Sequence, residues 1–202
     1  MDHIAPVDSS LRVQRDGVNA IVRITGGYDE PDWQRMTPCD GWTATDLAGH
    51  VLTAIDNWHV LLDDSEARAS RPRFAWAEMD QFFKDRLAAL PPGTGPQRIA
   101  RFVDRAEQYF DRVEALDREL PLVSAFRDVT TVPMTIGLFA WLGGIEWHVH
   151  AWDFARTTGQ PYRTDHAATL HEAAAATFGG TVGDEDPWEA ILNSLRPGSD
   201  QC

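Results

Sequence analysis

The stretch TVPMTIGLFAWLGGIEWHVHAWDFARTTG, residues 131–159, decides the fold because it reads as one long apolar helix with polar side chains on a single face. At about 100° per residue, Glu146, His150 and Asp153 lie within roughly 60° of one another around the helix axis. Burying a bare carboxylate costs several kcal/mol unless a positive group meets it. The sequence therefore predicts that this face meets either a cation or a tight hydrogen-bond network on a neighbouring helix.

The composition indicates one compact globular domain. The chain has 202 residues, of which 43% are hydrophobic and 24% are charged, which is ordinary for a protein with a real core. Its formal net charge of -13 repels a phosphate backbone, and no lysine- and arginine-rich stripe interleaved with aromatic residues occurs. We therefore expect no nucleic-acid partner.

Three features of the sequence predict a cytoplasmic protein. The start, MDHIAPVDSS, lacks the basic patch and apolar run of a secretory signal. The longest apolar run, residues 132–145, has about 14 residues, whereas a membrane span needs about 20. Two cysteines, Cys39 and Cys202, are too few for a disulfide framework or a zinc ribbon and fit a reducing compartment. No membrane partner is expected.

Apolar residues recur at helical spacing along much of the remaining chain, with short joins rich in turn-forming residues. The pattern predicts helices over residues 11–25, 43–61, 79–90, 96–116, 131–159, 166–178 and 187–195. Strand signals are almost absent; one run, residues 120–133, could hold a short extended piece but cannot form a sheet alone. The expected fold class is all-α, a four-helix bundle with short additional helices.

The helix that follows residue 43 is expected to place a histidine in the core. Thr43 and Asp46 have the spacing of a capping box, in which each side chain satisfies a free N–H group at the start of the helix. In the helix that follows, His50 falls within the apolar stripe, whereas Asp46 and Asn57 fall on the polar side. The imidazole of His50 therefore faces inward.

These inward side chains form a candidate metal site. Glu146 and His150 are four residues apart, so on a helix they lie one turn apart and can chelate one ion. Among the other histidines, His50 alone sits squarely on the apolar stripe of a strong helix. Two histidines and one glutamate leave coordination positions open, as in catalytic zinc sites. Zinc is our first choice, although imidazole also suits nickel, iron and copper.

Asp153 is expected to contact a residue that binds the metal rather than the metal itself. It lies about one turn past His150, so it could accept the second ring N–H of a ligating histidine or bond the loop before Thr43.

Other interpretations of the same residues stay open at this point. Glu146 and His50 could form a buried ion pair without any metal. His148 points about 160° away from Glu146's side of its helix, so we place it on the opposite face. Cys39 precedes a helix N-terminus, a position that could lower its pKa and make it a nucleophile.

Two segments resemble a known family. TPCDGWTATDLAGHVL, residues 37–52, and EWHVHAWDFARTTGQP, residues 146–161, are similar in order and separation to the two signatures of the mycothiol-dependent maleylpyruvate isomerase family, within the DinB/YfiT-like superfamily. The resemblance covers residues 8–178. It implies a DinB-like four-helix bundle over that range, with residues 179–202 as a short helical tail.

The resemblance also implies a site and a reaction. A divalent metal, usually zinc, would be held by His50, Glu146 and His150, with mycothiol as thiol cosubstrate. A metal with an open position can hold a thiol as the thiolate near neutral pH. That thiolate would serve addition, transfer or isomerisation on a small electrophile. The catalytic and thiol-binding residues beyond the metal ligands are not predicted.

The sequence is also compatible with two alternative functions. One is a thiol-independent metal hydrolase, in which bound water is the nucleophile. The other is a non-catalytic bundle that binds a small ligand. The sequence does not identify the substrate. It is compatible with a homodimer.

Overall fold

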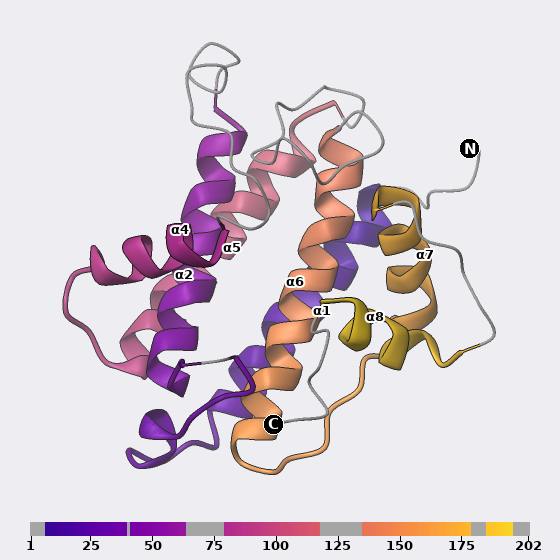
Figure 1. Cartoon of the computed structure of the whole chain (residues 1–202). Helices are drawn as coiled ribbons and strands as arrows, with labels where there is room; N and C mark the ends of the chain where they lie inside the picture. The colour runs from indigo at the N-terminus through magenta and orange to yellow at the C-terminus, as the bar shows by residue number, and fades with distance from the viewer. Residues whose placement is uncertain (1–6, 40, 64–78, 118–134, 179–184, 196–202) are drawn as a thin grey trace.

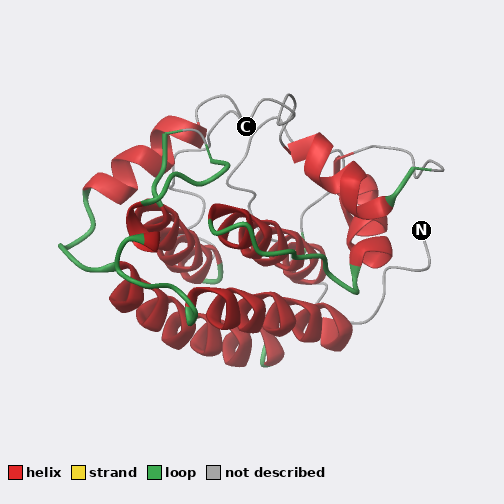
Figure 2. Ribbon diagram, turned by 90° about the horizontal axis from the view of Figure 1, so that it is seen from below, coloured by secondary structure: helices red, strands yellow, loops and turns green. Residues whose placement is uncertain are grey.

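The computed structural model describes residues 7–39, 41–63, 79–117, 135–178 and 185–195, and every regular element in these ranges is a helix. In chain order the elements are α1 (Val7–Thr25), the 3-10 helix η1 (Asp32–Gln34), α2 (Ala44–Leu61), α4 (Met79–Ala88), α5 (Gly95–Glu114), α6 (Ile136–Thr157), α7 (Ala167–Phe178) and α8 (Pro187–Leu195). Figure 2 draws helices and loops but no strand over the described residues. The all-α prediction is confirmed.

Four long helices form the bundle, and they pack in two pairs. Helix α6 lies along α1, and α2 lies along α5, with α2 also in contact with α6 (Figure 1). The shorter α4 packs on α2, while α7 and α8 lie together beside α6. This arrangement brings α2 and α6, the two helices that carry the candidate site, into contact from distant parts of the chain.

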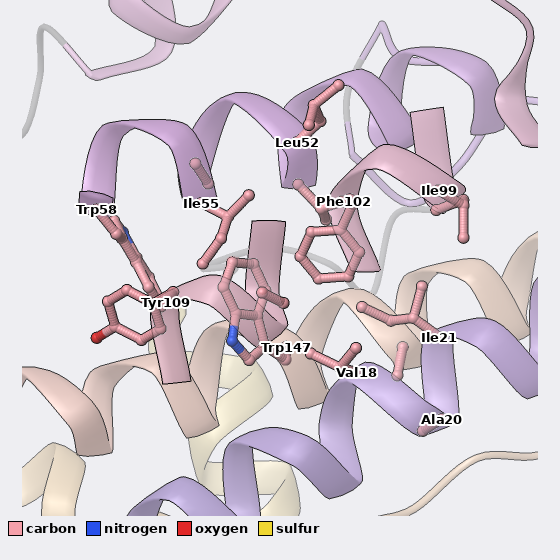
Figure 3. Packing of buried hydrophobic residues seen from close by; sticks show 14 of the residues in the cluster. Val18, Ala20, Ile21, Leu52, Ile55, Trp58, Ile99, Phe102, Tyr109 and Trp147 are labelled. Atoms are coloured by element: carbon pink, nitrogen blue, oxygen red, sulfur yellow. The ribbon is translucent and has the colours of Figure 1, made fainter. Parts of the chain in front are cut away.

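Trp147 fills the centre of the bundle, on the turn of α6 between Glu146 and His148. Its ring is fully buried and lies 4.5 Å from the ring of Trp58 and 5.0 Å from that of Phe102, measured between centroids (Figure 3). Its indole N–H donates to the Gln14 side chain of α1 over 3.2 Å. Aromatic pairs at such separations stabilise a core beyond the area they bury. This packing fixes the rotation of α6 and hence the direction of its polar face.

A second apolar cluster joins α7 and α8 to the bundle. Trp188 of α8 and Leu170 of α7 are buried together with Val13 of α1 and Trp141 of α6. The boundary near residue 178 that the sequence suggests between bundle and tail stays a prediction.

The helix bounds agree with the predicted segments apart from a few details. Thr135 caps α6 by accepting from the Leu138 N–H, so the described helix begins later than residue 131. Residues 118–134, which include the predicted extended piece, lie outside the described residues. Val22 of α1 is 40% exposed, so it lies outside the buried stripe formed by Val18 and Ile21. None of the described helices has the length and apolar character to cross a membrane.

Gly143 allows α6 to approach its neighbours closely, and replacing it is expected to destabilise the protein. A Cβ atom at this position would lie 2.3 Å from Gln14 Oε1 and 2.7 Å from a ring carbon of Trp58. Overpacking of this kind costs about 1–3 kcal/mol. We expect Gly143→Ala to lower the urea midpoint of unfolding accordingly. Gly27→Ala, whose Cβ would meet only a carbonyl at 3.5 Å, is the control, and equal midpoints for the two variants would refute the packing argument.

Candidate metal centre

Three side chains from α2 and α6 converge on one point. His50 Nε2 lies 3.0 Å from His150 Nε2, and each of these atoms lies 3.2 Å from the same oxygen, Oε1 of Glu146. Both imidazoles are buried, whereas the Glu146 side chain is 32% exposed. The cluster is therefore closed on its histidine side and reaches solvent through its carboxylate.

Local structure at the start of α2 places His50. The Thr43 hydroxyl accepts from the Asp46 N–H, and the Asp46 carboxylate accepts from the Thr43 N–H, so the predicted capping box is present. It starts α2 at Ala44, about 1.7 turns before His50. The His50 ring contacts the half-buried rings of Trp42 and Phe83, at centroid distances of 4.8 and 4.4 Å.

Asp153 contacts the nitrogen of His150 that faces away from the cluster. Its carboxylate is fully buried, and Oδ2 lies 2.8 Å from His150 Nδ1. With the proton on Nδ1, His150 donates to Asp153 and presents the lone pair of Nε2 to His50 and Glu146. The same Oδ2 atom lies 3.4 Å from Cys39 Sγ, in the loop before Thr43. Asp153 thus makes contacts both with a histidine of the cluster and with that loop.

Opposing effects set the charge of the cluster. Burial alone would lower the pKa of His150, but the Glu146 charge and the hydrogen bond to Asp153 raise this pKa well above its ordinary value. Burial would raise the pKa of Glu146, yet the neighbouring histidines hold it far below its usual range. Burial lowers the pKa of His50. The shifts of His150 and Glu146 both reflect the attraction between a protonated imidazole and a carboxylate at this point.

The geometry and the donor types fit a divalent metal ion. Two ligand atoms bound tetrahedrally to one zinc ion, each at 2.0–2.1 Å, lie about 3.3 Å apart. The three separations of 3.0 and 3.2 Å are close to that spacing. Without an ion, two imidazole Nε2 atoms that face each other need a shared proton, whereas a cation accepts the lone pairs of both. His50, Glu146 and His150 therefore form a suitable set of donors.

The other candidate residues lie away from this point or contact it from outside. His148 is buried on another side of α6, where Nε2 meets the Val13 carbonyl oxygen at 3.0 Å and Nδ1 meets the Tyr162 hydroxyl at 2.5 Å. Burial lowers its pKa to about 4. Cys39 forms a second possible metal-binding group with His150 and Asp153.

Sequence reasoning missed the aromatic side chains around His50, and it named the loop before Thr43 as a possible partner of Asp153 without identifying Cys39 as the residue in contact. Phe83 is only one of several apolar residues at helical spacing, and nothing local to it indicates that its ring meets His50. Trp42 belongs to the segment that resembles the family. That resemblance marks Trp42 as a residue of interest but does not indicate that its ring contacts His50. The contact between Cys39 and Asp153 joins residues 114 positions apart, so helical spacing alone does not show which residue of that loop meets Asp153.

The fold and the cluster define a helical bundle with a candidate metal centre between α2 and α6. The chain belongs to the family described as mycothiol maleylpyruvate isomerase N-terminal domain, whose model matches residues 15–155. This range includes His50, Glu146 and His150. The match confirms the family predicted from the two sequence segments, and with it the prediction of an enzyme.

Solved structures agree on the fold. The crystal structure of the mycothiol-dependent maleylpyruvate isomerase superposes with a TM-score of 0.68 at 12% sequence identity, covering 99% of this chain and 94% of that chain. A histidine-to-alanine mutant of the same isomerase gives a TM-score of 0.63 at 12% identity and the same coverage. No curated protein sequence matches this chain.

Proposed function

We propose that this protein is a divalent-metal-dependent enzyme that uses a low-molecular-weight thiol, mycothiol, to act on a small electrophile. The convergence of His50, Glu146 and His150 on one point is the observation that carries the proposal. The name of the family favours isomerisation over addition or transfer as the reaction. In such an isomerisation the thiolate adds to a cis double bond conjugated to a carbonyl, the adduct rotates about the resulting single bond, and loss of the thiolate leaves the trans product.

Three residues would hold the metal, with zinc as the first choice. His50 and His150 would donate their Nε2 lone pairs, and Glu146 would donate Oε1. When bound there, a divalent cation supplies a Lewis acid that favours the thiolate form of a thiol near neutral pH. Three protein ligands are the usual number in catalytic zinc sites and leave room for an external donor.

Residues around the cluster would orient the metal ligands and leave one side of the site open to the substrates. Asp153 holds the His150 ring in the tautomer that presents Nε2, over a hydrogen bond of 2.8 Å. Trp42 and Phe83 contact the His50 ring with apolar surface, which limits the rotation of that ring. Glu146 is the most exposed of the three, so we place the approach of thiol and electrophile on its side.

The dependence on a thiol tests the proposal against the hydrolase alternative. With zinc-loaded protein, mycothiol and a cis-configured electrophile such as maleylpyruvate, we expect trans product. Omission of the thiol is expected to lower the rate by at least about 100-fold, because general catalysis at the site cannot replace the nucleophile. The assay follows the absorbance of the conjugated product.

S-methyl mycothiol is the matched control, since it keeps the sugar and acyl groups but cannot form a thiolate. Full activity with S-methyl mycothiol, or with no thiol at all, would refute the thiol mechanism and favour a metal-bound water as nucleophile. A location in the cytoplasm and a homodimer stay predictions.

A further inference from the structure

Two polar side chains share one oxygen atom of Asp153. Oδ2 lies 2.8 Å from His150 Nδ1 and 3.4 Å from Cys39 Sγ, the latter within the range of a thiol hydrogen bond. The Asp153 side chain is 0% exposed, so these contacts are shielded from solvent. A hydrogen bond in such surroundings restricts the carboxylate more than it would at the surface.

The loop before α2 fixes the position of the Cys39 thiol. The Cys39 N–H donates to the Thr37 hydroxyl over 3.1 Å, and the Cys39 carbonyl oxygen accepts from the Trp42 N–H over 3.1 Å. The Thr37 N–H donates to the Trp42 carbonyl oxygen over 2.9 Å, and an isolated bridge pairs Met36 with Thr43 where α2 begins. The loop that positions Cys39 is therefore continuous with the helix that carries His50.

We propose that Cys39 is a positioning residue for the metal centre, because its thiol donates to Asp153 Oδ2 and so holds the carboxylate that orients His150. The inference rests on the metal site of the proposed function and adds a residue that does not touch the metal. The contact links the loop before α2, through Asp153, to the proposed ligand His150 on α6.

The direction of the contact argues against Cys39 as a metal ligand. Cys39 meets Asp153 on the Nδ1 side of the His150 ring, whereas Nε2, on the other side of the ring, faces His50 and Glu146. Nδ1 is already engaged with Asp153 at 2.8 Å. Partners outside the ligand shell commonly change metal affinity by about 10–100-fold when they are removed.

The test measures metal affinity in three variants of the full chain. Cys39→Ala and Cys39→Val remove the donor, the second while filling most of the volume, and Cys39→Ser keeps an O–H donor. We expect the zinc dissociation constant, measured by competition with a chelating dye, to rise about 10-fold in Cys39→Ala and Cys39→Val. Cys39→Ser is expected to stay within about threefold of the wild type. Cys202→Ala is the matched control and is expected to leave the affinity unchanged.

Two further measurements separate positioning from other roles. In Asp153→Asn protein, the Cys39→Ala substitution is expected to have little additional effect, because residues that act through one network are not additive. The cobalt-substituted wild type is expected to lack the near-ultraviolet band of sulfur-to-cobalt charge transfer. That band would identify Cys39 as a ligand and overturn the inference.

The affinities of the variants also decide whether Cys39 is a positioning residue. Wild-type affinity in both Cys39→Ala and Cys39→Val, or a loss in Cys39→Ser as large as in Cys39→Ala, overturns the positioning role while leaving the proposed function intact. A wild type that binds no divalent metal overturns both. Circular dichroism of each variant checks that the helices are retained, and Cys39→Val replaces Cys39→Ala if the smaller side chain does not fold.

Discussion

Replacing His50 by alanine is expected to abolish thiol-dependent activity. His50 is the only ligand of the proposed site that comes from α2, and it lies 3.0 Å from His150 Nε2 and 3.2 Å from Glu146 Oε1. Its loss leaves two ligands on one helix, one turn apart. Since removal of partners outside the ligand shell already costs about 10–100-fold, removal of a ligand is expected to lower kcat/KM by more than about 100-fold. Steady-state kinetics with mycothiol and a cis electrophile give the value.

His166→Ala is the matched control for this variant. His166 pairs with Asp16 at 2.8 Å near the surface and takes no part in the cluster. His148→Ala would be a poor control because His148 is buried and joins α6 to α1 through the Val13 carbonyl oxygen. Activity in His50→Ala that matches His166→Ala would show that the cluster is not the catalytic site.

Replacing Glu146 by glutamine is expected to weaken metal binding with little change in shape. The amide keeps an oxygen near both Nε2 atoms but removes the negative charge that offsets the cation. A buried or partly buried charge is expensive without a partner, so the neutral site should hold a divalent ion less tightly. We expect the zinc dissociation constant to rise at least about 10-fold, with a parallel loss of activity at limiting zinc. Isothermal titration calorimetry measures the affinity directly.

Glu114→Gln provides the comparison for that substitution. Glu114 is half exposed, its carboxylate pairs with Arg15 at 2.8 Å, and neither residue belongs to the His50, Glu146 and His150 cluster. Exposed ion pairs of this kind contribute little to the free energy of unfolding. If Glu146→Gln and Glu114→Gln bind zinc with the same affinity as the wild type, the carboxylate of Glu146 is not a ligand.

Local patterns were sufficient to predict the helices that carry the site. The capping box at Thr43 and Asp46 sets the start of α2, and the apolar stripe after it turns His50 inward. The spacing of Glu146 and His150 sets their common face on α6 because the helix repeat is regular. These features depend on residues within a few turns of one another, which is the range over which a sequence pattern carries information.

Long-range contacts could not be predicted in the same way. The approach of Cys39 to Asp153 and of Phe83 to His50 depends on how the loop before α2 and helix α4 pack against the bundle. Packing of this kind is set by many side chains together, such as the rings around Trp147. The two segments that resemble the family contain Cys39, His50 and Asp153, so they indicated which stretches of the chain to consider together.

The metal content of freshly purified, untagged protein tests the central claim most directly, with the wild type and His50→Ala compared side by side by elemental analysis. The account predicts about one divalent ion per wild-type chain, zinc foremost, and almost none in the correctly folded His50→Ala variant. Equal metal content in the two proteins, or a wild type that neither contains nor takes up a divalent ion, would contradict it.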